Sequence, residues 1–400
     1  MSKTKGNVAS FLLTGVLFLA YIASLHPWFF WGVENWITLF GLLVIMGCFV
    51  LFPNIFSREN FRGEVLLLLL FALVCQFRTS NFFGIVFLVI SFLFVGFVLA
   101  LRNDVKVLLL ERLTKWLACF LFVSLLFWIL HQLGIKQPSA FAEYVQDGNV
   151  LYSYTNYYWF MIDNRSVDSL LPRFSSVFLE PGHLGMATSL LLAANGFNIK
   201  NKYSFIILVV TLCTFSLAAY VILFLGKLFQ LFVEKYKYRM VVLFTFILLI
   251  IGSWAFAAIY NNGDNIVNNY IFSRFELTSD EDIIAGNNRF SADFEYYFEM
   301  FMRSSDKWLG IGNEYDGTSW DGGNAGYKVY IVQNGLIGTF FVLLLYFNLL
   351  KGQFSWGGFA LVILFLISYL QRGYPLLMCF LITIILGVQS KYSKTRYNFS

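Results

Sequence analysis

The chain has 400 residues, of which 58% are hydrophobic and only 13% are charged, whereas soluble proteins carry about 25% charged residues. This composition excludes a soluble enzyme and places most of the chain in lipid. The formal net charge is +5, but no basic patch lies among aromatic residues, so nucleic-acid binding is excluded as well. All five cysteines lie in apolar stretches without CxxC spacing, which indicates neither disulfides nor metal ligation.

Apolar stretches of the length that a membrane-spanning helix requires, about 20 residues, recur along the chain. The first of them lacks the small-residue cleavage site of a signal peptide, so we expect it to remain as a helix. The stretches are 8–25, 36–52, 64–77, 82–101, 113–134, 181–197, 203–232, 240–260, 327–350, 357–371 and 374–390.

The charges of the short loops indicate how often the chain crosses the bilayer, because cytoplasmic loops are enriched in lysine and arginine. Single spans throughout would put the basic segment 227–239 on the outer face. Dividing the long stretch 203–232 at a turn near Thr214 and Ser216 returns this segment to the cytoplasm. We therefore predict about 12 transmembrane helices with both termini cytoplasmic. A single tilted helix with a misplaced basic loop is the less favoured alternative.

The same orientation sends two long connections to the outer face: the first loop, 135–180, and the second loop, 261–326. They hold most of the acidic residues, and connections of this length are usually functional. We thus expect one all-α polytopic membrane domain over residues 1–400, with its polar chemistry in these two large extracytoplasmic loops.

The most informative part of the first loop runs from Arg173 to Gly185. Pro181 suits the first position of a helix, so Arg173, Glu180 and His183 are expected to cluster at the outer membrane surface. There they would suit a phosphate-linked substrate, since arginine makes paired contacts with phosphate oxygens. Alternatively, the arginine extends to the interface, the glutamate complements the helix dipole and the histidine is a solvated first-turn residue. For His183 we favour this second interpretation.

Upstream in the first loop, Tyr157, Tyr158 and Trp159 belong to an aromatic run interleaved with asparagines. Flat rings beside amides suit a sugar chain, which makes these three residues candidates for substrate binding. A belt of interfacial aromatic residues explains them equally well.

The second loop contains an acidic cluster, Asp280–Asp282, that resembles a metal-binding Asp-x-Asp arrangement. We reject a metal there, because an isolated charge run is usually solvated and this face lacks nucleotide sugars. Aromatic residues at helical spacing over 289–303 predict an amphipathic helix lying on the membrane. Arg289 would stand at its anion-binding N-terminal end. Asn324, in a glycine-rich segment before the next span, is a further candidate for substrate binding.

Four features share one order along residues 170–345: Arg173-x-x-Ser-x-Phe-x-Glu180-Pro181, the Thr214-x-Ser216 turn, Arg289 upstream of Leu309-Gly310-Ile311-Gly312, and Asn334-Gly335-Leu336-Ile337-Gly338. This order resembles the Wzy-type oligosaccharide repeat-unit polymerases, which share a superfamily with the O-antigen ligases. The resemblance implies a GT-C-like, multi-pass glycosyltransferase of the bacterial inner membrane that needs no metal or other cofactor.

Such a polymerase moves a growing glycan from an undecaprenyl-pyrophosphate donor onto the end sugar of another lipid-linked repeat unit, which builds O-antigen, capsule or a related polysaccharide. A chain-length regulator and a flippase are expected partners. By position, Arg173 and Arg289 would be the essential arginines of the two loops. The 305–330 segment lacks the late histidine of the ligases, which favours a polymerase, and the distance from Arg289 to Gly310 exceeds the Arg-x15-Gly pattern of some polymerases.

We expect the two arginines to bind the pyrophosphate and to stabilise its developing charge. Glu180 would remove the acceptor proton, with His183 as its substitute. Two other classes remain. A transporter or flippase would favour inverted repeats, interrupted helices and charges within the spans, and the sequence shows no convincing repeat. A metal-dependent transferase would need acidic residues at 26–35, where only Glu34 is found.

Overall fold

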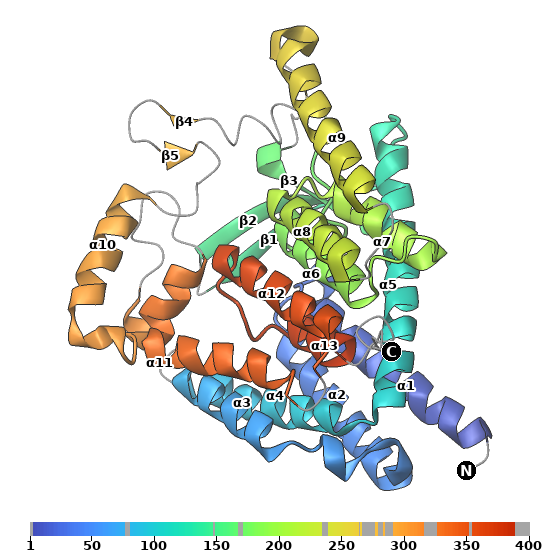
Figure 1. The fold of residues 1–400 in the computed structure, drawn as a ribbon, viewed down its shortest axis with the longest axis vertical. Coiled ribbons are helices and arrows are strands. Elements are labelled where there is room, and N and C mark those ends of the chain that lie inside the picture. Colours follow the sequence, from blue (N-terminus) through green and yellow to red (C-terminus); the bar gives the residue numbers. More distant parts are fainter. Residues whose placement is uncertain are drawn as a thin grey trace.

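The computed structural model describes residues 3–76, 81–146, 149–166, 171–233, 239–263, 265, 277–278, 283–284, 291–315, 326–351 and 354–388. These ranges are mostly helical (Figure 1). The helices are α1 Lys3–Ala23, α2 Glu34–Leu51, α3 Gly63–Cys75, α4 Phe82–Ala100, α5 Asn103–Gln132, α6 Pro181–Ala194, α7 Lys202–Cys213, α8 Leu217–Val233, α9 Arg239–Ile259, α10 Ala292–Arg303, α11 Tyr327–Asn348, α12 Trp356–Gln371 and α13 Met378–Gly387.

Each predicted apolar stretch coincides with a helix, except that 203–232 forms two, and the starts differ most at α1, which begins at Lys3, and at α5 and α13. α5 begins at Asn103, ahead of the predicted 113, because Lys106 folds back into the protein and donates to the Leu99 carbonyl at 2.7 Å. α13 begins only at Met378, since a turn containing Pro375 precedes it. Within the described residues, α2, α4, α5 and α11 are long and apolar enough to cross a membrane. The chain is therefore a mostly helical protein with the features of a membrane protein.

The predicted division of 203–232 is confirmed, because α7 ends at Cys213 and α8 begins at Leu217. Between them, Phe215 adopts a positive φ of 45°, a left-handed conformation that ends a helix. The Thr214 hydroxyl donates to the Thr211 carbonyl at 2.7 Å, and the Ser216 hydroxyl accepts from the first turn of α8 at 3.4 Å. Local polar side chains thus satisfy the backbone groups that the turn releases.

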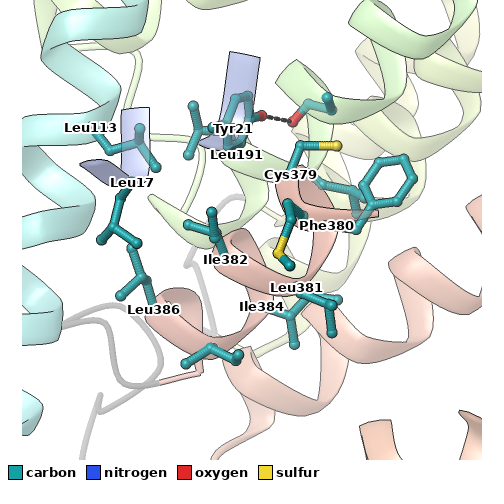
Figure 2. Packing of buried hydrophobic residues seen from close by; sticks show 14 of the residues in the cluster. Leu17, Tyr21, Leu113, Leu191, Cys379, Phe380, Leu381, Ile382, Ile384 and Leu386 are labelled. Carbon is teal, nitrogen blue, oxygen red and sulfur yellow. Dashed lines mark hydrogen bonds between the residues drawn. The ribbon is translucent and has the colours of Figure 1, made fainter. Parts of the chain in front are cut away.

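The interior is built around α6 and α13. Of the 14 residues of α6, all but Pro181 and Ala193 are buried, and the helix packs against α7, α8, α12 and α13. In Figure 2, α13 contributes Cys379, Leu381 and Ile382 to the hydrophobic cluster, and Tyr21 of α1 donates to the Ala187 carbonyl of α6 at 3.0 Å. A helix this deeply enclosed gives the residues at its N-terminus a fixed position.

The first loop carries a small antiparallel sheet, so the prediction of an all-α chain is wrong there. Its strands are β1 Ala140–Gln146, β2 Asn149–Asn156 and β3 Met161–Asp163, in the order β1-β2-β3. Strand residues alternate between two faces, and one face of β2 turns Tyr152 and Tyr154 inward toward Leu179. This short alternation was concealed in the sequence by the aromatic run around it.

The second loop contains α10, together with the paired strands β4 Leu277–Thr278 and β5 Ile283–Ile284. α10 begins at residue 292 rather than 289, because Ser291 caps it by accepting from the Phe294 amide at 3.2 Å. Its apolar face packs on the start of α11, where Phe294 and Phe301 are buried against Val332. The helix is amphipathic as predicted, but another helix covers the apolar face that was predicted to face the membrane.

α11 is interrupted at Gly335, whose φ of 74° and ψ of 175° are not helical. The segment 308–311 lies in the break: the Ile337 amide donates to the Trp308 carbonyl at 3.1 Å, and the Ile311 amide donates to the Val332 carbonyl at 2.9 Å. A Cβ on Gly335 would lie 2.3 Å from the carbonyl oxygen of Trp308. The two glycine motifs therefore form one interlocked contact.

Candidate functional site

The start of α6 has the geometry that the sequence predicts. Glu180 is extended, with φ −136° and ψ 134°, and Pro181 occupies the first helical turn. The residue before a proline disfavours the helical region, whereas proline itself loses no hydrogen bond at a helix start. These local rules place the Glu180 carboxylate beside the N-terminus of a buried helix.

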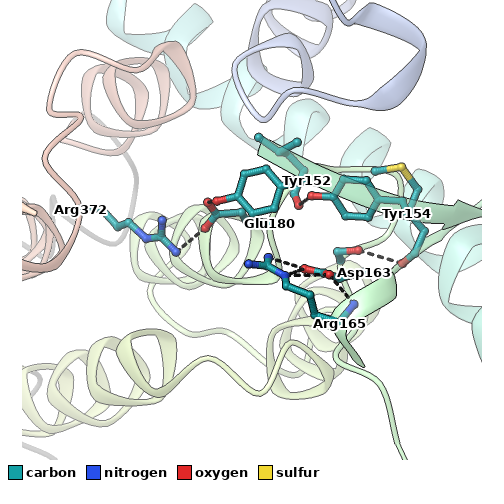
Figure 3. A network of polar contacts seen from close by, with 9 residues as sticks. Tyr152, Tyr154, Asp163, Arg165, Glu180 and Arg372 are labelled. Atoms are coloured by element: carbon teal, nitrogen blue, oxygen red, sulfur yellow. Dashed lines mark hydrogen bonds and ion pairs between the residues drawn. The ribbon is translucent and has the colours of Figure 1, made fainter. Parts of the chain in front are cut away.

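Buried polar groups surround the Glu180 side chain (Figure 3). Its Oε1 accepts from the Tyr152 hydroxyl of β2 at 2.7 Å, and its Oε2 forms an ion pair with Nη2 of Arg372, in the turn between α12 and α13. The two charged side chains are only 17% and 12% exposed, respectively. Three segments distant in sequence therefore meet at one carboxylate.

These contacts determine the charge of Glu180. Burial by itself would raise the pKa of the carboxyl, but the opposing effects of His183, Arg372 and the Tyr152 hydrogen bond hold that pKa well below its usual range. Burial and the nearby Glu180 carboxylate raise the pKa of Tyr152. A carboxylate that resists protonation is a weak proton acceptor. The geometry thus favours Glu180 as a fixed negative charge over the predicted general base.

A second ion pair supports the tyrosine that binds Glu180. The Arg165 Nη2 lies 2.6 Å from Oδ2 of Asp163 and its Nε lies 3.0 Å from Oδ1. The guanidinium stands 5.0 Å from the centre of the Tyr152 ring, at the distance of a cation–π contact. Tyr154, next along the same face, donates to the Leu179 carbonyl at 2.5 Å. The sheet is therefore attached to the chain immediately before α6 by these side chains and by a backbone hydrogen bond from the Met161 amide to the Ser176 carbonyl at 2.8 Å.

The three candidate sugar-binding aromatic residues lie at the turn between β2 and β3. Tyr157 stacks on Phe160 with centroids 4.7 Å apart, and Trp159 stacks on Phe127 of α5 at 5.7 Å. Tyr158 and Trp159 are exposed, at 47% and 44%. One face of each stacked ring is thus covered by protein, and these contacts agree with both the sugar-binding and the interfacial interpretation.

His183 is 6% exposed, so the expectation of a solvated first-turn residue is wrong. Its ring meets the Tyr374 ring edge to face, with centroids 5.7 Å apart. The turn between α12 and α13, which carries Tyr374, covers this part of α6. The sequence did not show that cover, because the turn lies almost 200 residues further along the chain.

Arg173 lies against the turn between α7 and α8. Its Nε donates to the Thr214 carbonyl at 3.0 Å, and the next amide, of Phe174, donates to the Cys213 carbonyl at 3.0 Å. Gly185 of α6 packs on the same turn, since a Cβ there would lie 2.7 Å from the Thr214 hydroxyl. The structure therefore brings two of the four noted sequence features together: the Arg173–Pro181 stretch at the start of α6 and the Thr214-x-Ser216 turn.

Several predicted residues lie outside the described ranges. They are Arg289, Asn324 and the acidic cluster Asp280–Asp282. Among the residues that are described, no group of three or more His, Cys, Asp or Glu side chains is placed to hold a metal ion.

Sequence reasoning missed Arg372, Tyr152 and Tyr154 as parts of this cluster. One signal was available for Arg372, which is a basic residue in a short loop that the predicted topology puts on the outer face, where the positive-inside rule disfavours it. A charge retained against that rule indicates a specific partner. The tyrosines carried no comparable signal within their aromatic run.

Comparison with known proteins adds no identification: no family model, no curated protein and no solved structure matches the chain.

Proposed function

We propose that this protein polymerises lipid-linked oligosaccharide repeat units in the bacterial cytoplasmic membrane, with about twelve spans and both termini in the cytoplasm. The acceptor hydroxyl oxygen attacks the anomeric carbon of the donor glycan, and the bond from that carbon to the undecaprenyl pyrophosphate breaks. The hydroxyl proton passes to a base, and the pyrophosphate leaves with the bonding electrons on the lipid. Arg173 and Arg289 bind this leaving group and stabilise its charge.

One observation carries the proposal: Arg173 and Thr214, from two features of the resemblance, are in contact, and Gly185 at the start of α6 packs on the same turn. The Nε of Arg173 is oriented by a backbone carbonyl, and a guanidinium held in this way is preorganised for an anion. Preorganised charge stabilises a transition state because it need not reorganise during the reaction.

The proposal changes the roles of the two residues at the start of α6. Glu180 stays ionised between Arg372 and Tyr152, so it contributes a fixed charge rather than proton transfer. His183, one helical turn further and beside Tyr374, is the remaining candidate for accepting the acceptor proton, in its neutral form.

The test is the ladder of surface polysaccharide made by cells that carry variants of Arg173. Arg173→Ala should abolish the polymer and leave single repeat units, because the leaving pyrophosphate is no longer stabilised by the positive charge of the Arg173 guanidinium. Arg173→Lys should fail to rescue, since an ammonium cannot reproduce a guanidinium held through Nε. Arg303→Ala is the matched control, because that side chain is 80% exposed on α10. A normal ladder from Arg173→Ala would contradict the proposal.

A flippase of lipid-linked sugars is the second candidate, because α11 is interrupted at Gly335 and broken helices are typical of transporters. In this break, however, the backbone of Trp308 and Ile311 forms hydrogen bonds with amide and carbonyl groups of α11 that a transported ligand would otherwise bind. A deletion strain separates the candidates. Loss of the ladder with a retained single capped unit indicates a polymerase, total loss of surface sugar a flippase, and polymer left on the lipid carrier a ligase.

A further inference from the structure

The turn between α12 and α13 is held firmly against α11. The Arg372 amide donates to the Ser368 carbonyl at 3.0 Å, and the Tyr346 hydroxyl of α11 donates to the Pro375 carbonyl. A Cβ on Gly373 would lie 2.2 Å from the carbonyl oxygen of Gly326, directly before α11. The backbone that carries Arg372 is therefore fixed independently of Glu180.

From this turn the Arg372 side chain extends over the first turn of α6. Its Nη2 would lie 2.8 Å from a Cβ on Gly182, so the guanidinium occupies the space that the glycine leaves open. Figure 3 shows the guanidinium directed at the carboxylate of Glu180. The following Tyr374 contacts His183. Both residues at the start of α6 that the sequence marks as candidates are thus contacted by this one turn.

We propose that Arg372 is a positioning residue of the site, and that its ion pair with Glu180 holds the first-loop sheet, the start of α6 and the α12–α13 turn in one arrangement. The proposal rests on the proposed polymerase function and adds to it a residue from outside the two long loops. Arg372 acts through Glu180, and through it on the placement of His183.

The ion pair suits this role because both of its side chains are mostly shielded from water, so solvent does not compensate for the loss of one partner. Two mostly buried charges stabilise each other, and removing one leaves the other charge buried without compensation. A misplacement of about 1 Å in a catalytic group lowers a rate by about 100-fold. Loss of the pair is thus expected to affect turnover even where the protein stays folded.

The ion pair also predicts a distinctive pH dependence for variants of Arg372. The groups that face Glu180 are Tyr152 from β2, His183 from α6 and Arg372 from the α12–α13 turn, with Arg165 beyond the Tyr152 ring. With Arg372 present, the carboxyl pKa is well below its usual range, so the pair persists as the pH falls toward weakly acidic values. Without the guanidinium, only His183 and the Tyr152 hydrogen bond oppose the effect of burial, so the carboxyl pKa rises and the carboxylate is protonated more readily as the pH falls.

The experiment measures polymerisation by purified protein in proteoliposomes that contain undecaprenyl-pyrophosphate-linked repeat units. We compare the wild type with Arg372→Gln, Glu180→Gln, the doubly neutral variant that combines these two substitutions, and Arg372→Lys. Arg372→Gln should lose about 100-fold in rate, and its rate relative to wild type should fall further from about pH 8 to about pH 5. In Glu180→Gln and the doubly neutral variant, the relative rate should be low without this added pH dependence. In Arg372→Lys, the rate relative to wild type should not vary with pH, because Lys retains the positive charge.

The exposed pair Glu299 and Arg303 of α10, at 3.9 Å, serves as the matched control, and its doubly neutral variant should polymerise as the wild type does. A melting-temperature cycle on the same Glu180 and Arg372 variants measures their coupling without using activity. If the effects of the two substitutions on the melting temperature are coupled but the wild type does not polymerise, the polymerase function is overturned and the ion pair is not. Wild-type rates in Arg372→Gln, or in the folded doubly neutral variant, would overturn the positioning role.

Discussion

The two long loops are attached to the helices by different interactions. The first loop reaches them through polar side chains, since Tyr152 and Arg372 converge on Glu180 and Tyr154 donates to the Leu179 carbonyl, as well as through the backbone hydrogen bond from Phe174 to Cys213. The described part of the second loop is attached through backbone groups at the Gly335 break, and through the apolar face of α10. A mostly buried ion pair therefore distinguishes the first attachment, and the close backbone approach at Gly335 distinguishes the second.

This difference bears on where chemistry can reside. A buried ionic cluster has a protonation state, so pH and charge-changing substitutions affect it directly. An interlock of glycine backbones has no charge to titrate, and only a change in volume or in φ disturbs it. The attachment of the first loop is accordingly the one that pH and charge-changing substitutions should affect most.

The largest effect is expected from Gly335→Ala. The new Cβ would lie 2.3 Å from the Trp308 carbonyl oxygen, at a residue whose φ is +74°. Because the obstacle is backbone and the conformation is strained for alanine, we expect a loss of more than about 4 kcal/mol in stability. Thermal unfolding in detergent measures it. Gly47→Ala in α2, with nothing within 4 Å of its Cβ, is the control and should change stability by less than about 1 kcal/mol. Similar unfolding of both variants would refute the interlock.

A smaller effect is expected from Tyr152→Phe, which removes the hydroxyl that donates to Glu180 at 2.7 Å. Hydrogen bonds to charged groups contribute about 1.5 to 3 kcal/mol, and we expect a loss in that range at neutral pH. The loss should disappear in the Glu180→Gln background if the carboxylate charge is responsible. Tyr158→Phe is the control, since that side chain is 47% exposed. Equal losses from the two tyrosines would show that the first loop does not depend on the ionic cluster.

The smallest effect is expected from Glu295→Gln, which breaks the ion pair between α10 and Lys328 of α11. The glutamate side chain is 41% exposed, and solvent screens such pairs, so the expected loss is about 0.2 to 1 kcal/mol. Unfolding at low and high salt should show the difference from wild type shrinking as salt rises. A loss larger than that of Tyr152→Phe would mean that charge also controls the attachment of the second loop.

The positions of the helices followed from the sequence, and so did several details of the candidate site. The apolar runs located the corresponding helices. The loop charges required a division of 203–232, and the structure divides this stretch at the turn that contains Phe215. Pro181 and Glu180 marked the start of α6, because proline and the residue before it obey local conformational rules. These properties are contained in one short window of sequence, so no knowledge of distant contacts was needed.

The partners of those residues were decided by the tertiary structure. Arg372 is almost 200 residues from Glu180, and Gly310 fits the break in α11 only because α10 packs on the start of that helix. No local rule specifies which charges or glycines meet, since this depends on how helices pack side by side. The sequence by itself thus determined which apolar segments are helical. Packing of the helices decided which residues act together, and whether Glu180 is free to accept a proton.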